Sequence, residues 1–395
     1  MTEQTPLKIA YLCDMDPHLS WTYSGGNQRI FKALQDHVGE VTYLDPSWGM
    51  AEPVRKLIHK LPESLNLRLR WRAHYLFSGL IAKNVKRQLR NGNYDAVFGV
   101  YSLNAMASLR VPDMMVRAFT SDATQSSYRA SEIGAGFGSF FKPARLLDRW
   151  VKAHETRCLQ ANDLNFWPSD WQKKQADQTY ALRDATSQVV PWGANISTPE
   201  RDTLNLDLPM QSEVRLLLVG RDWFAKGGPF VLEVLQRLLD LGVNARLSVI
   251  GTMPPPHDLG DHVDVYPNLD KSKPEDLATF EGLFKTSHLM VQPSLESFGF
   301  AFCEASAFAL PSLCLNRGGI PVWDGINGHA LPVGSTPQEF AELIQTYLKA
   351  PEEYQSLRHS ARRCFEDKLN WQAWGREVKR QLLVARAEKH GASTI

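Results

Sequence analysis

The sequence predicts an α/β protein of two successive domains, each with an open parallel sheet. Its 395 residues are two to three times the commonest domain size, which favours two domains over one. Short apolar runs recur along the chain, and each precedes a loop and a segment of helical periodicity, as in parallel sheets that are buried on both faces. A polar, proline-bearing stretch at 195–213 separates two such sets of elements.

The first set begins with the apolar run Leu7–Cys13, which predicts a buried strand. Gly25 and Gly26 then precede a segment whose apolar residues repeat at helical spacing as far as Val38. Further strands are predicted at Val41–Leu44, Tyr94–Val100, Met115–Phe119 and Leu164–Trp167. We assign these elements to a first domain, residues 1–195.

The second set repeats this alternation and defines a second domain, residues 212–370. Strands are predicted at Val214–Val219, Ala245–Ile250, Val263–Tyr266, Leu289–Gln292 and Ser312–Leu315. Helices are predicted at Pro229–Leu241, Pro274–Lys285, Ala301–Ala309 and Pro337–Lys349. From Ala361 to His390 the pattern is that of amphipathic helix with no further strand, and we expect residues 375–395 to pack back on the first domain.

Composition and charge exclude several classes of protein. Hydrophobic residues make up 43% of the chain, which is incompatible with disorder, and the net charge of +1 gives no support to a nucleic-acid partner. The five cysteines form no CxxC pair and the histidines no HExxH motif, so we expect neither a metal nor a cofactor. No signal-peptide pattern and no bilayer-length apolar run is found, and we therefore expect a cytoplasmic location.

A group of cationic and flexible residues follows the strand Val214–Val219. Arg221 and Lys226 stand there among Gly220, Gly227 and Gly228, immediately before a predicted helix. A guanidinium fork, an ammonium group and a helix N-terminus together suit the binding of phosphate. An ordinary solvated loop with two charges is the alternative.

A second segment of interest follows the strand Leu289–Gln292. Glu296 lies in the loop and Glu304 in the helix, with the backbone amides of Phe298, Gly299 and Phe300 between them. Carboxylates accept hydrogen bonds from sugar hydroxyls, and amides at a helix start suit a pyrophosphate. For Glu304, a salt bridge or an exposed helix face is the alternative.

These two segments resemble the donor-binding domain of family 4 (group 1) glycosyltransferases, which have the GT-B fold. The resemblance spans about 214–334 and includes both segments, Gly251 after the second strand, Gly318–Pro321 and Asn327–Gly328. It implies two Rossmann-like domains that face a central cleft. It also implies transfer of a hexose from a UDP- or GDP-sugar with retention of anomeric configuration, and without a metal.

The resemblance also implies roles for individual residues. Arg221 and Lys226 would hold the diphosphate and neutralise the leaving nucleotide, while Glu304 would bind the ribose and Glu296 the sugar. The amides of Phe298, Gly299 and Phe300 would surround the sugar and phosphate. Ser297 stands where the family commonly has glycine, and Ile320–Pro321 lacks a following glutamate, which limits assignment of the donor.

The first domain matches the family less closely. Gly25 and Gly26 resemble its glycine loop, where a helix N-terminus faces the donor phosphate, and an ordinary turn is the alternative. Many members have a histidine after a middle strand, where this chain has Asp122. Asp122 would orient the acceptor hydroxyl or take its proton, and an Asx-turn cap is the alternative.

The stretch 55–90 is strongly basic. It has ten lysines and arginines against the single acid Glu63, a local charge of +9, interleaved with apolar residues. This pattern suits an anionic membrane surface, near a lipid-linked acceptor, or an anionic acceptor itself. A solvated basic face over an ordinary core is the alternative, and nucleic-acid binding is a weaker third one because no recognised binding fold accompanies the charge. The favoured function is thus glycosyl transfer to a sugar or lipid-linked acceptor in polysaccharide or glycolipid synthesis. The rivals are an epimerase or phosphorylase of the same fold and a non-catalytic nucleotide-sugar-binding protein.

Overall fold

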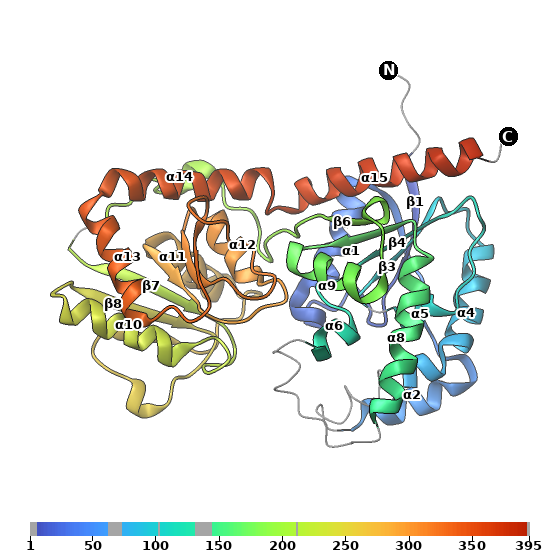
Figure 1. Cartoon of the computed structure of the whole chain (residues 1–395), viewed down its shortest axis with the longest axis horizontal. Coiled ribbons are helices and arrows are strands. Elements are labelled where there is room, and N and C mark those ends of the chain that lie inside the picture. Colours follow the sequence, from blue (N-terminus) through green and yellow to red (C-terminus); the bar gives the residue numbers. More distant parts are fainter. Residues whose placement is uncertain (1–5, 62–72, 102, 131–143, 211, 393–395) are drawn as a thin grey trace. The chain divides into compact units, whose positions relative to one another are not determined.

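Two parallel six-stranded sheets organise the computed structural model, which describes residues 6–61, 73–101, 103–130, 144–210 and 212–392 (Figure 1). The chain divides into two units. Unit 1 comprises Met1–Pro191 and Trp374–Ile395, and unit 2 comprises Trp192–Ala373. Each unit has its own sheet and its own buried apolar core.

The sheet of unit 1 has the strand order β2-β1-β3-β4-β5-β6, and all neighbouring strands are parallel. Its strands are β1 (Leu7–Leu12), β2 (Gly39–Tyr43), β3 (Ala96–Val100), β4 (Val116–Thr120), β5 (Leu164–Trp167) and β6 (Ser187–Val189). Its helices are α1 (Gly26–His37), α2 (Glu52–His59), α4 (Ser78–Arg90), α5 (Asn104–Ala107), α6 (Gln125–Ala130), α8 (Ala144–Gln160) and α9 (Asp170–Tyr180). Because all the strands run the same way, their carboxyl ends lie along one edge, where ligands bind in open α/β sheets.

The sheet of unit 2 has the order β12-β11-β10-β7-β8-β9 and is also parallel throughout. Its strands are β7 (Val214–Val219), β8 (Ala245–Ile250), β9 (Val263–Tyr266), β10 (Leu289–Val291), β11 (Ser312–Leu315) and β12 (Gly328–Leu331). Its helices are α10 (Gly228–Asp240), α11 (Pro274–Thr286), α12 (Phe300–Ala307), α13 (Pro337–Lys349) and α14 (Pro351–Asp367). The central strand β7 is nearly all apolar and pairs on both sides, so its loop lies in the middle of the sheet edge.

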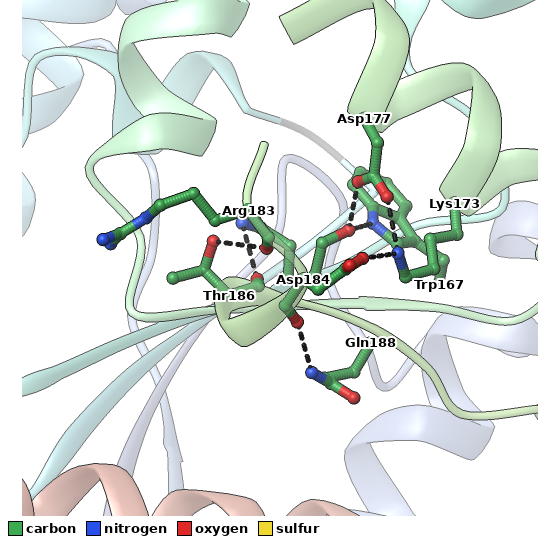
Figure 2. A network of polar contacts seen from close by, with 9 residues as sticks. Trp167, Lys173, Asp177, Arg183, Asp184, Thr186 and Gln188 are labelled. Atoms are coloured by element: carbon green, nitrogen blue, oxygen red, sulfur yellow. Dashed lines mark hydrogen bonds and ion pairs between the residues drawn. The ribbon is translucent and has the colours of Figure 1, made fainter. Parts of the chain in front are cut away.

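A polar network holds the edge strand β6 to helix α9 (Figure 2). The Trp167 indole donates to Ser187 Oγ at 2.9 Å, and the Ser187 hydroxyl donates to Asp177 Oδ1 at 2.5 Å. Lys173 bridges Asp177 and Asp184 at 2.6 and 2.7 Å. The network offsets the small number of hydrogen bonds that a three-residue strand can make.

The C-terminal region differs from the single amphipathic helix expected over 361–390. Two helices, α14 and α15 (Trp371–Ala392), are separated at residues 368–370. Asn370 explains the break, because its amide donates to the carbonyls of Phe365 and Glu366 and its Oδ1 accepts the N–H of Ala373. One side chain thus satisfies both helix ends.

Helix α15 packs on unit 1, on the side where the strands begin (Figure 1). Trp374 lies edge-on to Phe98 of β3, Arg386 pairs with Asp95, and Lys389 pairs with Asp163. These acids directly precede β3 and β5. None of the described helices is both long and apolar enough to cross a bilayer.

Candidate functional site

The carboxyl edge of the unit 2 sheet brings Lys226 and Glu296 into direct contact. Lys226 lies between β7 and α10, and its Nζ forms an ion pair with Oε1 of Glu296, which lies between β10 and α12. The same Oε1 accepts the Ser294 hydroxyl at 2.7 Å. The Lys226 stem lies against Gly220, where a Cβ would overlap it. Seventy residues apart in sequence, the two groups therefore form one charged pair.

The loop that carries Arg221 and Lys226 is fixed at several points. Trp223 is buried and its indole donates to Asp258 Oδ2 at 3.1 Å. Gly228 lies against the Trp223 ring, where a Cβ would come within 2.2 Å of ring atoms, and Gly227 has a φ of +80°. The loop is thus ordered by packing rather than freely solvated. Arg221 itself is exposed, and no carboxylate of the described residues pairs with it.

A glycine contact positions the backbone of Glu296. Gly318 has a φ of +77°, and a Cβ there would lie 2.2 Å from the Glu296 carbonyl oxygen. The Gly319 amide donates to that same oxygen at 2.8 Å. Only glycine allows this close approach together with a left-handed backbone. Gly318 and Gly319, which are part of the family resemblance in the sequence, therefore hold the loop that carries Glu296.

Glu304 is buried in α12 and pairs with Lys271. The Nζ of Lys271 lies 2.9 Å from Glu304 Oε1, and the same ammonium lies 4.0 Å from the centre of the Phe280 ring. The salt bridge considered above as the alternative for Glu304 is therefore present. A ribose-binding role is compatible with it, because a carboxylate has a second oxygen and further lone pairs.

Aromatic packing sets the entry to α12. Gly299, with a φ of +85°, is its N-cap, so the first-turn amides that include Phe300 begin at a left-handed residue. The buried Phe298 lies edge-on to Trp192, and Phe300 stacks on the same indole at 5.9 Å. The amides of Phe298, Gly299 and Phe300 are thereby held at the sheet edge that carries Glu296.

In unit 1, Gly25 ends a left-handed turn that leads into α1. Tyr23, Ser24 and Gly25 have φ values of 50°, 54° and 86°, and Gly26 is the first helical residue. The Tyr23 hydroxyl donates to Asp14 Oδ1 at 2.6 Å, and Asp14 lies just after β1. Consecutive left-handed non-glycine residues are rare and concentrate at functional sites. The turn is therefore more specialised than an ordinary strand–helix connection.

Asp122 follows β4 at the same edge. It is half-buried, and its charge, after burial itself, contributes to a pKa of Tyr101 well above the ordinary value. At the turn that follows, Ser121 Oγ accepts the Ala123 amide at 3.4 Å, and Oε1 of Glu155 accepts the Gln125 amide at 2.9 Å. Side chains other than Asp122 therefore contribute to capping this turn.

The basic stretch separates into two different surfaces. In α4 the apolar residues Ile81, Val85 and Leu89 are buried, and Lys83 and Lys86 face outward, as in a solvated face over a core. In and before α2 three apolar side chains are exposed, Met50, Val54 and Leu57, at 91%, 43% and 65%, whereas Ile58 packs against the unit 1 core. Arg68, Arg70 and Arg72 lie outside the described residues.

Comparison with known proteins identifies the second unit. Residues 213–350 match the family model of glycosyl transferases group 1. The chain carries a group 1 glycosyltransferase domain. Glu296, Glu304, Lys226 and Arg221 all belong to this domain. A search of curated proteins finds no match.

Solved glycosyltransferase structures extend the likeness to the whole chain. Sucrose-phosphate synthase from Thermosynechococcus elongatus has 17% identity and a TM-score of 0.62 over 97% of this chain and 100% of its own. WaaG, a glycosyltransferase of lipopolysaccharide biosynthesis, has 14% identity and a TM-score of 0.58 over 95% and 99%. Anabaena HepE in complex with UDP-glucose has 13% identity and a TM-score of 0.56 over 96% and 100%. The predicted GT-B fold, with two Rossmann-like domains, is confirmed.

Sequence reasoning missed Lys271 and the Tyr23–Asp14 contact. Lys271 lies in the loop between β9 and α11, five residues after the strand ends, and Asp14 lies two residues after β1, so both belong to loops that follow strands. Their position in the sequence after strands, which places them at the carboxyl edge of a parallel sheet, was the signal that could have indicated these residues. In the part of the chain that is described, no group of three or more histidines, cysteines or acids lies together as metal ligands would.

Proposed function

We propose that this chain transfers a hexose from a UDP- or GDP-sugar to an acceptor hydroxyl, with retention of anomeric configuration. The observation that carries the proposal is the contact of Lys226 with Glu296. Lys226 has the chemistry to bind a diphosphate, and Glu296 the chemistry to bind sugar hydroxyls. In a nucleotide sugar these two parts are joined by the bond that transfer breaks. We therefore expect the bond between sugar and diphosphate to lie next to this pair.

Arg221 and Lys226 would act on the leaving group. As the bond from the anomeric carbon to the phosphate oxygen breaks, negative charge grows on that oxygen, and preorganised cations stabilise it. The acceptor oxygen bonds to the anomeric carbon on the same face, and its proton passes to the departing phosphate oxygen. Lys226 has three N–H donors, so one can stay with Glu296 while others reach phosphate. This chemistry proceeds without a metal.

Asp122 would orient the acceptor hydroxyl, and Gly25 and Gly26 would place the α1 amides near the donor phosphate. Asp122 and the left-handed turn both lie at the carboxyl edge of the unit 1 sheet, which supports a common role. The structure of a similar protein was solved with UDP-glucose, which makes that compound the first donor to test here.

A turnover assay tests the proposal directly. The protein is incubated with UDP- and GDP-hexoses and sugar or lipid-linked acceptors, with EDTA present, and products are analysed by mass spectrometry and NMR. Transfer with retention is expected. Epimerised donor in the absence of acceptor, sugar phosphate formed from added phosphate, or donor binding without turnover would each favour one of the rival functions. Loss of transfer in EDTA with rescue by Mn²⁺ would contradict metal independence.

We further propose that α2 attaches the protein to an anionic membrane near a lipid-linked acceptor. Met50, Val54 and Leu57 are exposed there beside the exposed Lys56 and Lys60. Exposed apolar side chains interleaved with lysines suit the headgroup boundary of an anionic bilayer. The buried apolar face of α4 gives no such support, so the proposal rests on α2 and the residues before it.

A further inference from the structure

Lys271 and Glu304 form a second lysine–glutamate pair in unit 2, in addition to the pair of Lys226 and Glu296. Both glutamates belong to the sequence pattern that the resemblance includes, and each is paired with a lysine from the loop after another strand. The two side chains of this second pair differ more in solvent exposure than those of Lys226 and Glu296 do. The Glu304 side chain is 5% exposed, whereas that of Lys271 is 37% exposed.

The Glu304 carboxylate uses only one of its oxygens within the protein. Oε1 accepts from Lys271 at 2.9 Å, and no donor of the described residues contacts Oε2. Oε2 is not among the fully buried atoms that lack a hydrogen-bond partner in the described residues, so it keeps some accessible surface. Oε2 therefore has the capacity for a ligand's hydroxyl group at the sheet edge.

Lys271 fixes the position of the Glu304 carboxylate. Its ammonium is the donor that the structure supplies to Oε1, and the same ammonium lies 4.0 Å from the centre of the Phe280 ring. A charge-assisted hydrogen bond has a defined geometry, so this contact orients the carboxylate and with it Oε2. Removal of one partner from a buried ion pair is costly, so Glu304 depends on Lys271 for its place.

We propose that Lys271 is a positioning residue of the donor site, which holds Oε1 of Glu304 and so directs Oε2 to the ribose hydroxyls of a nucleoside diphosphate. This inference rests on the proposed function, because it takes Glu304 as the ribose ligand. Lys271 itself need not touch the nucleotide. Its contribution is then specific for the ribose and leaves the contacts of Arg221 and Lys226 with phosphate unchanged.

The test is calorimetric titration of the full chain with UDP and GDP and with their 2′-deoxy counterparts. In the unaltered protein the ribonucleotide should bind more tightly than its deoxy form. Lys271→Met should lower the affinity for the ribonucleotide about 10- to 100-fold, the range expected for a hydrogen bond to a charged group. It should also largely abolish the preference for the ribonucleotide over its 2′-deoxy form. Lys271→Arg should keep most of this preference. Lys273→Met, two residues along the same loop, is the matched control and should change nothing.

The discrimination itself separates this role from a merely structural one, because a general loss of fold would weaken binding of the ribonucleotide and of its 2′-deoxy form alike. Glu304→Gln should lose the discrimination as Lys271→Met does. The double variant Lys271→Met/Glu304→Gln should lose no more of it than either single variant, since the two residues act together. Discrimination retained in Lys271→Met would overturn the role of Lys271 alone. Failure of the unaltered protein to bind either nucleotide would overturn the proposed function and this inference with it.

Discussion

The ring of Tyr23 stacks on the ring of Tyr101 with centroids 3.9 Å apart and an interplanar angle of 2°. Both residues have left-handed backbones, with φ values of 50° and 60°. Tyr101 directly follows β3, and Tyr23 reaches Asp14 after β1. The stack therefore joins the ends of two neighbouring strands and opposes the cost of two strained residues.

Tyr23→Phe should retain the stack and lose the hydrogen bond to Asp14. We expect the free energy of unfolding to fall by about 1–2 kcal/mol, since the acceptor is a carboxylate. Tyr23→Leu should lose a further 0.5–1.5 kcal/mol or so with the aromatic pair. Urea unfolding midpoints measure both. Equal values for Phe and Leu would mean that the ring contributes only its apolar area.

Arg221→Ala and Lys226→Ala should each lower turnover at least about 100-fold, the scale of one lost preorganised contact to developing charge. Arg237→Ala, an exposed arginine of α10, removes the same charge away from the site and should leave turnover unchanged. Steady-state kinetics with the identified donor measure all three. Near-native turnover in both site variants would refute the phosphate-binding assignment.

Glu155 should make unfolding depend on pH. Burial raises its pKa above the ordinary value of 4.5, although hydrogen bonds from Ser126, Tyr180 and the Gln125 amide oppose the shift. The folded protein then holds this proton to a higher pH than the unfolded chain does. Stability contributed by Glu155 should be fully present below pH 4.5 and fall as the pH rises through the raised value. Urea unfolding across this range should show the decline, and Glu155→Gln should remove it.

Membrane attachment should depend on α2 rather than α4. Replacing Met50, Val54 and Leu57 with Ser, and Lys56 and Lys60 with Gln, should reduce sedimentation with anionic vesicles, since each basic residue contributes about 1 kcal/mol near such a surface. Lys349→Gln with Arg237→Gln is the control of equal charge in unit 2. If the unaltered protein stays in solution at low salt, the surface is an ordinary solvated one.

The strands of unit 2 could be predicted from the sequence because most are buried on both faces. Predicted and observed limits coincide for β7, β8, β9 and β11. The short strands β6 and β12 lie at sheet edges and were not predicted, because Ser187, Gln188 and His329 interrupt any apolar run.

The candidate site was only partly predictable for a related reason. The glutamates and the cationic loop stand next to strands that the sequence reveals. The pairing of Lys271 with Glu304 depends on how the β9–α11 loop meets α12, across 33 residues, and no periodicity encodes that contact. Asn370 was visible as a helix-capping residue type, yet only the structure shows that it serves two helices.

Unit 1 consists of two segments with all of unit 2 between them in sequence. During synthesis from the N-terminus, the strands of unit 1 emerge first, but Trp374, Arg386 and Lys389 of α15 emerge after unit 2 is complete. Phe98, Asp95 and Asp163 therefore gain these contacts only after the whole of unit 2 has been synthesised.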